Sequence, residues 1–309
     1  MTPDRGPGAV SAARLYRPLA PFVALERRLG EAALARGPVA AGLYEFLRFG
    51  VKQGWACLFG GLLVALLLAT HLAYPAGAPL TRYDALVLAA LAIQAGLLAT
   101  GMETWAEARI ILVFHVVGTV MELFKTAAGS WVYPEASWLR IGAVPLFSGF
   151  LYAAVGSYMA RVWRLFDFRF TRHPSLPATL ALSAAIYLNF FTHHYGPDLR
   201  LLLFAWTAWL FRGTVVHFKV WRVHRRMPLL VGFGLVTLFI WLAENLGTFA
   251  NAWRYPNQAA GWAMVPFAKF GSWFLLMIVS YVLVSTQHRI APPPEADEPL
   301  PAGVPQAAR

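Results

Sequence analysis

The chain has 309 residues, of which 58% are apolar and 13% are charged, and its formal net charge at pH 7 is +11. Soluble domains contain about 45–50% apolar residues even when glycine is counted, and about a quarter of their residues are charged. A water-soluble globule of this size could not bury so much apolar surface, so we exclude soluble enzymes, nucleic-acid-binding modules and disordered scaffolds. The composition predicts an all-α polytopic membrane helix bundle, with the lipid bilayer as its partner.

Eight apolar segments have the length to cross a bilayer, which takes about 20 helical residues. We expect about eight transmembrane helices at 51–74, 82–102, 107–130, 141–162, 177–195, 199–217, 228–250 and 262–286. These segments are continuous apolar runs without alternation, which argues against a β-barrel.

Basic residues concentrate before the first segment and in the links after the fourth, sixth and eighth segments. The opposite links hold only Arg82, Arg140, Arg200 and Arg254. This asymmetry predicts a multi-pass protein of the inner (plasma) membrane with both termini in the cytoplasm. The link at 103–109 is the weakest part of this prediction, because its charges nearly cancel.

The organisation along the chain follows from these segments. We expect residues 1–49 to be a cytoplasmic N-terminal segment, partly disordered or lying at the membrane interface. Residues 50–286 form the predicted membrane domain, and residues 287–309, rich in proline, a disordered cytoplasmic tail. The single cysteine, Cys57, excludes a disulfide within the chain.

A motif in the third segment recurs in the seventh. Glu122, Thr126, Trp131, Tyr133 and Pro134 recur 122 residues later as Glu244, Thr248, Trp253, Tyr255 and Pro256. The same offset links Thr70-His71 to Thr192-His193, and Val144-Pro145 recurs as Val265-Pro266 with a slip of one residue. Because the offset spans four predicted helices, an even number, we predict two parallel repeats, at 51–162 and 177–286.

The repeated acids, Glu122 and Glu244, lie inside apolar segments, where an ionised carboxylate costs roughly 2.5–3.5 kcal/mol on insertion scales. We expect both to face the bundle interior about 13 Å below the outer tryptophan, given a rise of about 1.5 Å per residue. A carboxylic acid in an apolar pocket can act as a general acid. We interpret the pair as candidate catalytic residues tuned by His115, His71 and His193; the alternative is that the acids only fix helix packing.

Other polar and aromatic residues near the repeated motif are candidate substrate contacts. These are Thr126, Trp131, Tyr133, Asn189, His194, Thr248, Trp253 and Tyr255. An aromatic belt at the membrane surface explains the tryptophans and tyrosines equally well. The histidines show no spacing typical of a metal site, so we predict neither a metal nor a cofactor.

Four stretches resemble the YoaT-like family of bacterial integral membrane proteins. They are Glu-Leu-Phe-Lys with Gly-Ser-Trp-Val-Tyr-Pro-Glu (122–135), Val-Pro-Leu-Phe-Ser-Gly-Phe (144–150), Tyr-Leu-Asn-Phe-Phe-Thr-His-His (187–194) and Trp-Arg-Tyr-Pro-Asn-Gln (253–258). The resemblance covers about 50–286. It implies a membrane fold but no activity, because the function of that family is unknown.

A second resemblance points toward chemistry. The frame Glu122, Gly129, Trp131 and Tyr133 is similar to that of the heterodimeric-type membrane lycopene cyclases, and of carotenoid hydratases. Those proteins are built from repeats and protonate polyenes with membrane-embedded carboxylates, which implies an isoprenoid ligand. The chain departs from the cyclases after Pro145 and Pro266, where they carry two glutamates and this chain has Leu-Phe-Ser and Phe-Ala-Lys.

The sequence therefore favours a membrane enzyme or binding protein for an isoprenoid or similar apolar lipid, with the paired glutamates as acid and base. A proton-coupled transporter and a non-enzymatic membrane assembly factor remain as alternatives.

Overall fold

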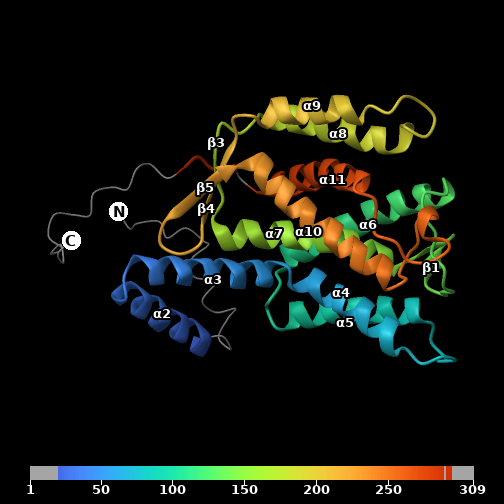
Figure 1. The fold of residues 1–309 in the computed structure, drawn as a ribbon, viewed down its shortest axis with the longest axis horizontal. Helices are drawn as coiled ribbons and strands as arrows, with labels where there is room; N and C mark the ends of the chain where they lie inside the picture. The colour runs from blue at the N-terminus through green and yellow to red at the C-terminus, as the bar shows by residue number, and fades with distance from the viewer. Residues whose placement is uncertain (1–19, 289, 294–309) are drawn as a thin grey trace.

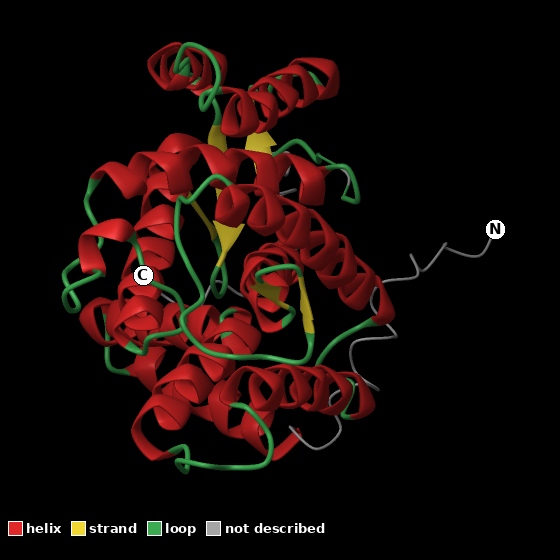
Figure 2. Cartoon of the chain, turned by 90° about the vertical axis from the view of Figure 1, so that its right-hand side faces the viewer, coloured by secondary structure: helices red, strands yellow, loops and turns green. Residues whose placement is uncertain are grey.

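The computed structural model describes residues 20–288 and 290–293, and this part of the chain is mostly helical (Figure 1). The helices before the first hairpin are α2 (Ala20–Ala35), α3 (Pro38–Ala56), α4 (Leu58–Ala73), α5 (Arg82–Ala99) and α6 (Trp105–Ala127). Those after it are α7 (Phe147–Phe166), α8 (Leu176–Thr192), α9 (Arg200–Phe211), α10 (Leu229–Phe249) and α11 (Ala268–Ser285). Most run side by side along the long axis, and α8 and α9 lie together on one edge (Figures 1 and 2).

Four of the described helices, α5, α6, α10 and α11, are long and apolar enough to cross a membrane. The α3–α4 pair counts as a fifth span if its two parts are taken together, although they are bent by 69° at Cys57. Helices α8 and α9 are apolar but have 17 and 12 residues. The predicted helical membrane protein is thus supported by four or five helices.

Several predicted segment boundaries differ from the structure. The segment at 51–74 contains the α3–α4 bend at Cys57, where the sequence has no proline, and Gly54 and Gly60 lie three residues to either side of it. The first residues of the segment at 141–162 lie in a hairpin of β1 (Arg140–Ile141) and β2 (Val144–Pro145), because Gly142 turns the chain at φ +58°. The segment at 199–217 loses its helix at Phe211, and its last residues form a strand.

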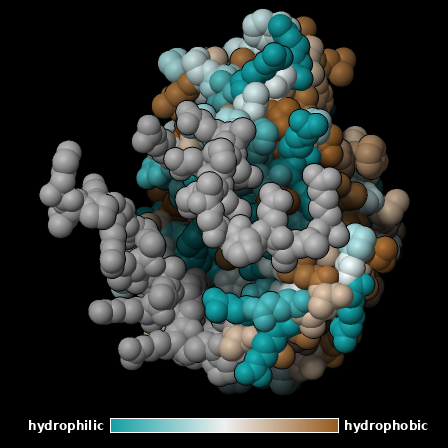
Figure 3. Space-filling model, turned by 90° about the vertical axis from the view of Figure 1, so that its left-hand side faces the viewer, coloured by the Kyte–Doolittle hydropathy of each residue, from teal (hydrophilic) through white to brown (hydrophobic). Residues whose placement is uncertain are grey.

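A three-stranded antiparallel sheet, not predicted from the sequence, lies at one end of the bundle. Its order is β3 (Arg169–Thr171), β4 (Val215–Lys219) and β5 (His224–Pro228). Lys52 Nζ ties α3 to this end by donating to the carbonyls of Leu165 (2.8 Å) and Lys219 (2.9 Å). The view of this end shows hydrophilic side chains, in teal, on its surface (Figure 3). The basic links therefore build an ordered cap.

Where the structure describes it, the predicted N-terminal segment 1–49 holds α2 and the first part of α3, which continues to Ala56. Helix α2 ends before Gly37, whose φ of +102° separates it from α3. Phe22, Leu25 and Leu43 are more than half exposed. Residues 1–19 and most of the predicted tail, 294–309, lie outside the described residues.

Helix α7 packs against α3, α4, α5, α6 and α11. Its contact with α6 is close because glycines face larger side chains: a Cβ on Gly118 would lie 2.5 Å from Tyr152 Cγ. A Cβ on Gly149 would lie 2.5 Å from His115 Nδ1, and one on Gly156 would lie 2.6 Å from Phe114. Small residues at such contacts let helix backbones approach in membranes. This packing brings Tyr152 of α7 beside Glu122 of α6.

Candidate functional site

Helices α6 and α10 end in the same way, which turns the following chain back toward the bundle. Gly129 (φ +69°) and Asn251 (φ +55°) adopt the left-handed conformation just beyond the two helices. Ser130 N–H donates to the Lys125 carbonyl (2.9 Å), and Ala252 N–H donates to the Gly247 carbonyl (3.0 Å). Both ends are thus Schellman motifs, in which asparagine can replace glycine.

Glu122 is 4% exposed and lies five residues before the end of α6. Its Oε2 accepts hydrogen bonds from Trp131 Nε1 (2.7 Å) and the Tyr133 hydroxyl (2.6 Å). Its Oε1 accepts one from the Tyr152 hydroxyl (2.8 Å). The expected separation of 13 Å from Trp131 is wrong, because the turn at Gly129 folds the indole back onto the carboxylate.

Glu244 is 3% exposed and lies five residues before the end of α10. Its Oε1 accepts a hydrogen bond from the Tyr255 hydroxyl, and its Oε2 accepts one from Trp273 Nε1 of α11 (2.5 Å). Both acids therefore face the interior as predicted, and aromatic N–H and O–H groups satisfy both. A buried carboxylate without such donors would be costly.

The two carboxylate sites touch through their aromatic donors. The Trp131 and Tyr255 rings meet edge to face with centroids 6.0 Å apart, and the Tyr152 and Trp273 rings lie 6.1 Å apart. Each ring pair joins a donor to Glu122 with a donor to Glu244. Beside them the loop backbones form a two-bond bridge, with Val132 N–H to Arg254 O at 3.0 Å and Arg254 N–H to Val132 O at 2.9 Å. The two acids thus belong to one site.

The turn after α10 is also held by the start of α5. Arg82 Nη2 donates to the Ala250 carbonyl (2.5 Å), and the Tyr83 hydroxyl donates to the Ala252 carbonyl (3.0 Å). Arg82 also pairs with Glu135. These contacts fix the loop that carries Tyr255, which pre-organises the site.

A cation lies at the aromatic faces of the site. Lys269 Nζ is 4.2 Å from the centroid of the Tyr255 ring and 5.4 Å from that of Trp131. Trp131, Tyr255 and Val265 form a small buried apolar cluster apart from the main core. Burial first, and then the adjacent carboxylates, raise the pKa of Tyr133 and of Tyr255 well above the ordinary value, so both phenols keep the protons that they donate.

The histidines predicted to tune the acids lie elsewhere. His193 Nε2 and His194 Nε2 lie 3.4 and 2.8 Å from Nζ of Lys125, a lysine only 5% exposed. His193 Nδ1 donates to the Asn189 carbonyl (2.8 Å), which leaves Nε2 free to accept from the ammonium. His115 packs on Phe150 and Gly149, and the exposed His71 packs on Phe249.

The remaining candidates have mostly local contacts. Thr126 Oγ1 donates to the Glu122 carbonyl (2.7 Å), Thr248 Oγ1 accepts from Trp262 Nε1 (3.2 Å), and Trp253 packs on Gly247. Asn189 Oδ1 accepts from Leu199 N–H (3.0 Å). Within the described residues, no three His, Cys, Asp or Glu side chains gather as a metal site.

Two residues of the site, Tyr152 and Trp273, were missed in the sequence. They come from the next helix, 30 and 29 residues after the acids that they contact. A signal for them exists, because 121 residues separate them, and the same offset links Val144-Pro145 to Val265-Pro266. Extending the repeat into α7 and α11 would have found the pair.

Comparisons with known proteins agree with the first resemblance. Residues 45–281 match the family described as "Protein of unknown function (DUF817)". The chain is 41% identical over 246 residues to the "Uncharacterized protein YoaT" of Bacillus subtilis (strain 168). The aligned residues cover 80% of this chain and 92% of the relative. No solved structure matches.

Proposed function

Since the chain belongs to the DUF817 family of proteins of unknown function, we propose its role from the geometry: a membrane enzyme or binding protein for an isoprenoid or similar apolar lipid. Glu122 and Glu244 are its acid–base pair. The observation that carries this proposal is the joining of two buried carboxylates through two pairs of aromatic rings.

The proposal includes a duplicated architecture of two parallel four-helix repeats with eight spans, in the inner membrane with both termini cytoplasmic. Its support is the equivalence of contacts at the sequence offset. Tyr133 and Tyr255 each donate to the acid eleven residues earlier. Gly129 and Asn251, also 122 residues apart, share a conformation, and the backbone bridge joins the equivalent positions Val132 and Arg254.

The chemistry requires one carboxyl group protonated and the other ionised, the usual state of two acids in one low-dielectric site. The protonated acid gives its proton to a carbon–carbon double bond, whose π electrons form the new C–H bond and leave a carbocation. The carboxylate removes a proton from a neighbouring carbon, and a double bond re-forms. The sum of these two steps is an isomerisation. A cyclisation adds one step between them, in which the π electrons of a second double bond in the same molecule attack the carbocation and form a C–C bond, leaving a new carbocation that loses the proton. Neither reaction needs an oxidant or reductant, and the aromatic faces stabilise the cation.

The loop between α10 and α11 presents apolar side chains at the surface beside the site. Trp262, Met264 and Phe267 on this loop are 52%, 62% and 69% exposed, whereas Val265 between them is fully buried against the site. Such a row of exposed apolar side chains suits contact with acyl or isoprenoid chains. We therefore place the entrance at this loop.

A proton-coupled transporter is the second candidate, and Lys269 favours it. Its ammonium lies at the rings of Tyr255 and Trp131, which donate hydrogen bonds to Glu244 and Glu122. A cationic substrate could compete for that position while the acids exchange protons, as at the repeat interfaces of carriers. A non-enzymatic assembly role would need neither acid to ionise.

The test is an unbiased extraction of lipids and pigments from a deletion strain and its parent. The strain is complemented with the wild type, Glu122→Gln, Glu244→Gln, or Glu31→Gln, an exposed control acid on α2. We expect an altered isoprenoid that the wild type and the control restore and the two site variants do not. Unchanged isoprenoids would contradict the enzyme proposal, and full rescue by both site variants would reduce the acids to a packing role.

A further inference from the structure

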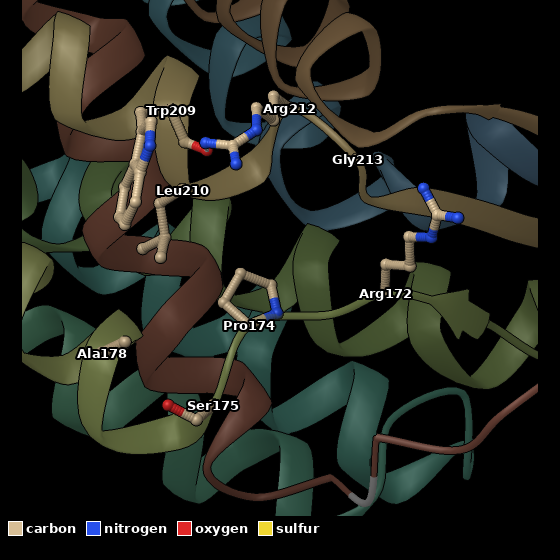
Figure 4. A pocket seen from close by; sticks show the side chains of 8 residues that line it. All are labelled: Arg172, Pro174, Ser175, Ala178, Trp209, Leu210, Arg212 and Gly213. Atoms are coloured by element: carbon tan, nitrogen blue, oxygen red, sulfur yellow. Dashed lines mark hydrogen bonds between the residues drawn. The ribbon is translucent and has the colours of Figure 1, made fainter.

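An open pocket of about 380 Å³ lies far from the paired acids, between the start of α8 and the end of α9 (Figure 4). Residues of the β3–α8 link and the first turn of α8 form one wall, and Trp209 to Gly213 contribute to the other. The pocket adjoins the three-stranded sheet, at the end of the bundle where the basic links lie.

Two arginines line this pocket, one from each wall, and no carboxylate lines it. Neither Arg172 nor Arg212 forms an ion pair with any residue that the structure describes. Arg212 donates one hydrogen bond, from Nη1 to the Trp209 carbonyl (3.2 Å), and its guanidinium lies 5.2 Å from the Trp209 ring centroid. Since a guanidinium has five N–H groups, most donors of the pair remain for a ligand.

The walls that carry the arginines are fixed. The Thr214 hydroxyl donates to the Arg172 carbonyl (3.0 Å), and Thr171 pairs with Val215 in the sheet. His173 Nε2 lies 2.8 Å from the Tyr281 hydroxyl of α11. Arg172 is held at φ +51°, a conformation that few residues other than glycine adopt. The backbone thus holds the base of each side chain in place before any ligand arrives.

We propose that this pocket binds a phosphate group, held by Arg172 and Arg212. The guanidinium fork matches phosphate oxygens in geometry as well as charge. Ser175, the N-cap of α8, adds a hydroxyl that makes no capping hydrogen bond. A phospholipid headgroup and free phosphate share this chemistry. The 61% exposed Trp209 beside the pocket favours the lipid, because tryptophan prefers the membrane interface.

The experiment uses the full chain purified in a neutral detergent. Its melting temperature and native mass spectrum are recorded with phosphatidylglycerol, with inorganic phosphate, and with a neutral diacylglycerol that lacks phosphate. We expect phosphatidylglycerol to bind and stabilise, and diacylglycerol to do neither. Arg172→Gln and Arg212→Gln should each weaken binding by about tenfold or more, because each removes charge-assisted hydrogen bonds.

Arg222→Gln is the matched control, since it removes the same charge from the β4–β5 turn outside the pocket. It should bind as the wild type does, and Arg172→Lys should fall between, because lysine keeps the charge but lacks the fork. Stabilisation by inorganic phosphate that the pocket variants lose would identify free phosphate as the source. Equal binding by the wild type and both pocket variants, or no binding of either ligand, would overturn the proposal.

Discussion

The indole of Trp131 and the phenol of Tyr255 meet edge to face at 6.0 Å while each donates a hydrogen bond to a different buried glutamate. Trp131 follows α6 and Tyr255 follows α10, so one aromatic contact joins the two helix ends. Because the two rings are in contact, displacing one of them also displaces the ring that donates to the other acid. We therefore expect the two carboxylates to respond to substitution as a coupled pair.

Substitution of the acids should distinguish the loss of charge from the loss of hydrogen-bond acceptors. Glu122→Leu leaves three donors without an acceptor, and Glu244→Leu leaves two. Each buried donor without an acceptor should lower the stability by about 1–3 kcal/mol. Glu122→Gln keeps one acceptor oxygen and the side-chain shape. We expect melting temperatures in detergent to fall in the order wild type, Gln, Leu, with the larger loss at Glu122. Leucine variants as stable as the glutamine variants would contradict this account of the donors.

Tyr133→Phe and Tyr255→Phe form a matched pair. Each removes one hydroxyl that donates to a buried carboxylate, and neither changes the ring that packs in the site. Each variant should lose about 0.5–3 kcal/mol of stability, a range that runs from a hydrogen bond to a neutral group to one with an ionised carboxylate. Chemical denaturation in mixed micelles would measure this. A loss at only one of the two tyrosines would show that the two halves are not equivalent.

The burial of Glu122 and Glu244 could be predicted because an acid in an apolar helix must avoid lipid. Their donors were only partly predictable. Trp131, Tyr133 and Tyr255 stood out through the repeat, but an aromatic belt explained them equally until the turns at Gly129 and Asn251 folded them inward.

Contacts between distant parts of the chain explain most of what the sequence did not indicate. The strands β4 and β5 have only five residues each. Strand β4 begins inside the apolar segment at 199–217, so its hydropathy resembles that of the helix before it. Lys125 illustrates the same limit: a lysine near a helix end usually reaches outward, but here His193 and His194 of another helix end surround it.

The α6–α7 contact should not tolerate a methyl group. A Cβ on Gly118 would lie 2.5 Å from Tyr152 Cγ and 2.6 Å from Tyr152 Cβ, atoms close to the α7 backbone that cannot swing away. Gly118→Ala should therefore cost about 1–3 kcal/mol as overpacking, and it should displace the hydroxyl that binds Glu122. Gly96→Ala on α5 is the control, because its Cβ would meet nothing within 4 Å and alanine favours a helix. Equal stability of the two variants, measured in the same detergent, would contradict the close packing.

The number of membrane crossings can be tested with single cysteines, because Cys57 is the only native one. In a Cys57→Ala background, Pro134→Cys and Pro256→Cys should react with a membrane-impermeant maleimide added outside the cells, and Arg222→Cys only after permeabilisation.

Helices α8 and α9, with 17 and 12 residues, are shorter than the roughly 20 residues that a span requires. The two helices form a hairpin, which starts and ends on the same side of the membrane. The side of the membrane on which residues 134 and 256 lie therefore does not depend on whether this hairpin crosses the bilayer. Gly196→Cys between them decides this point: outside labelling gives eight spans, and protection until permeabilisation excludes the α8–α9 crossing. Labelling of residues 134 and 256 from opposite sides would contradict the parallel repeat itself.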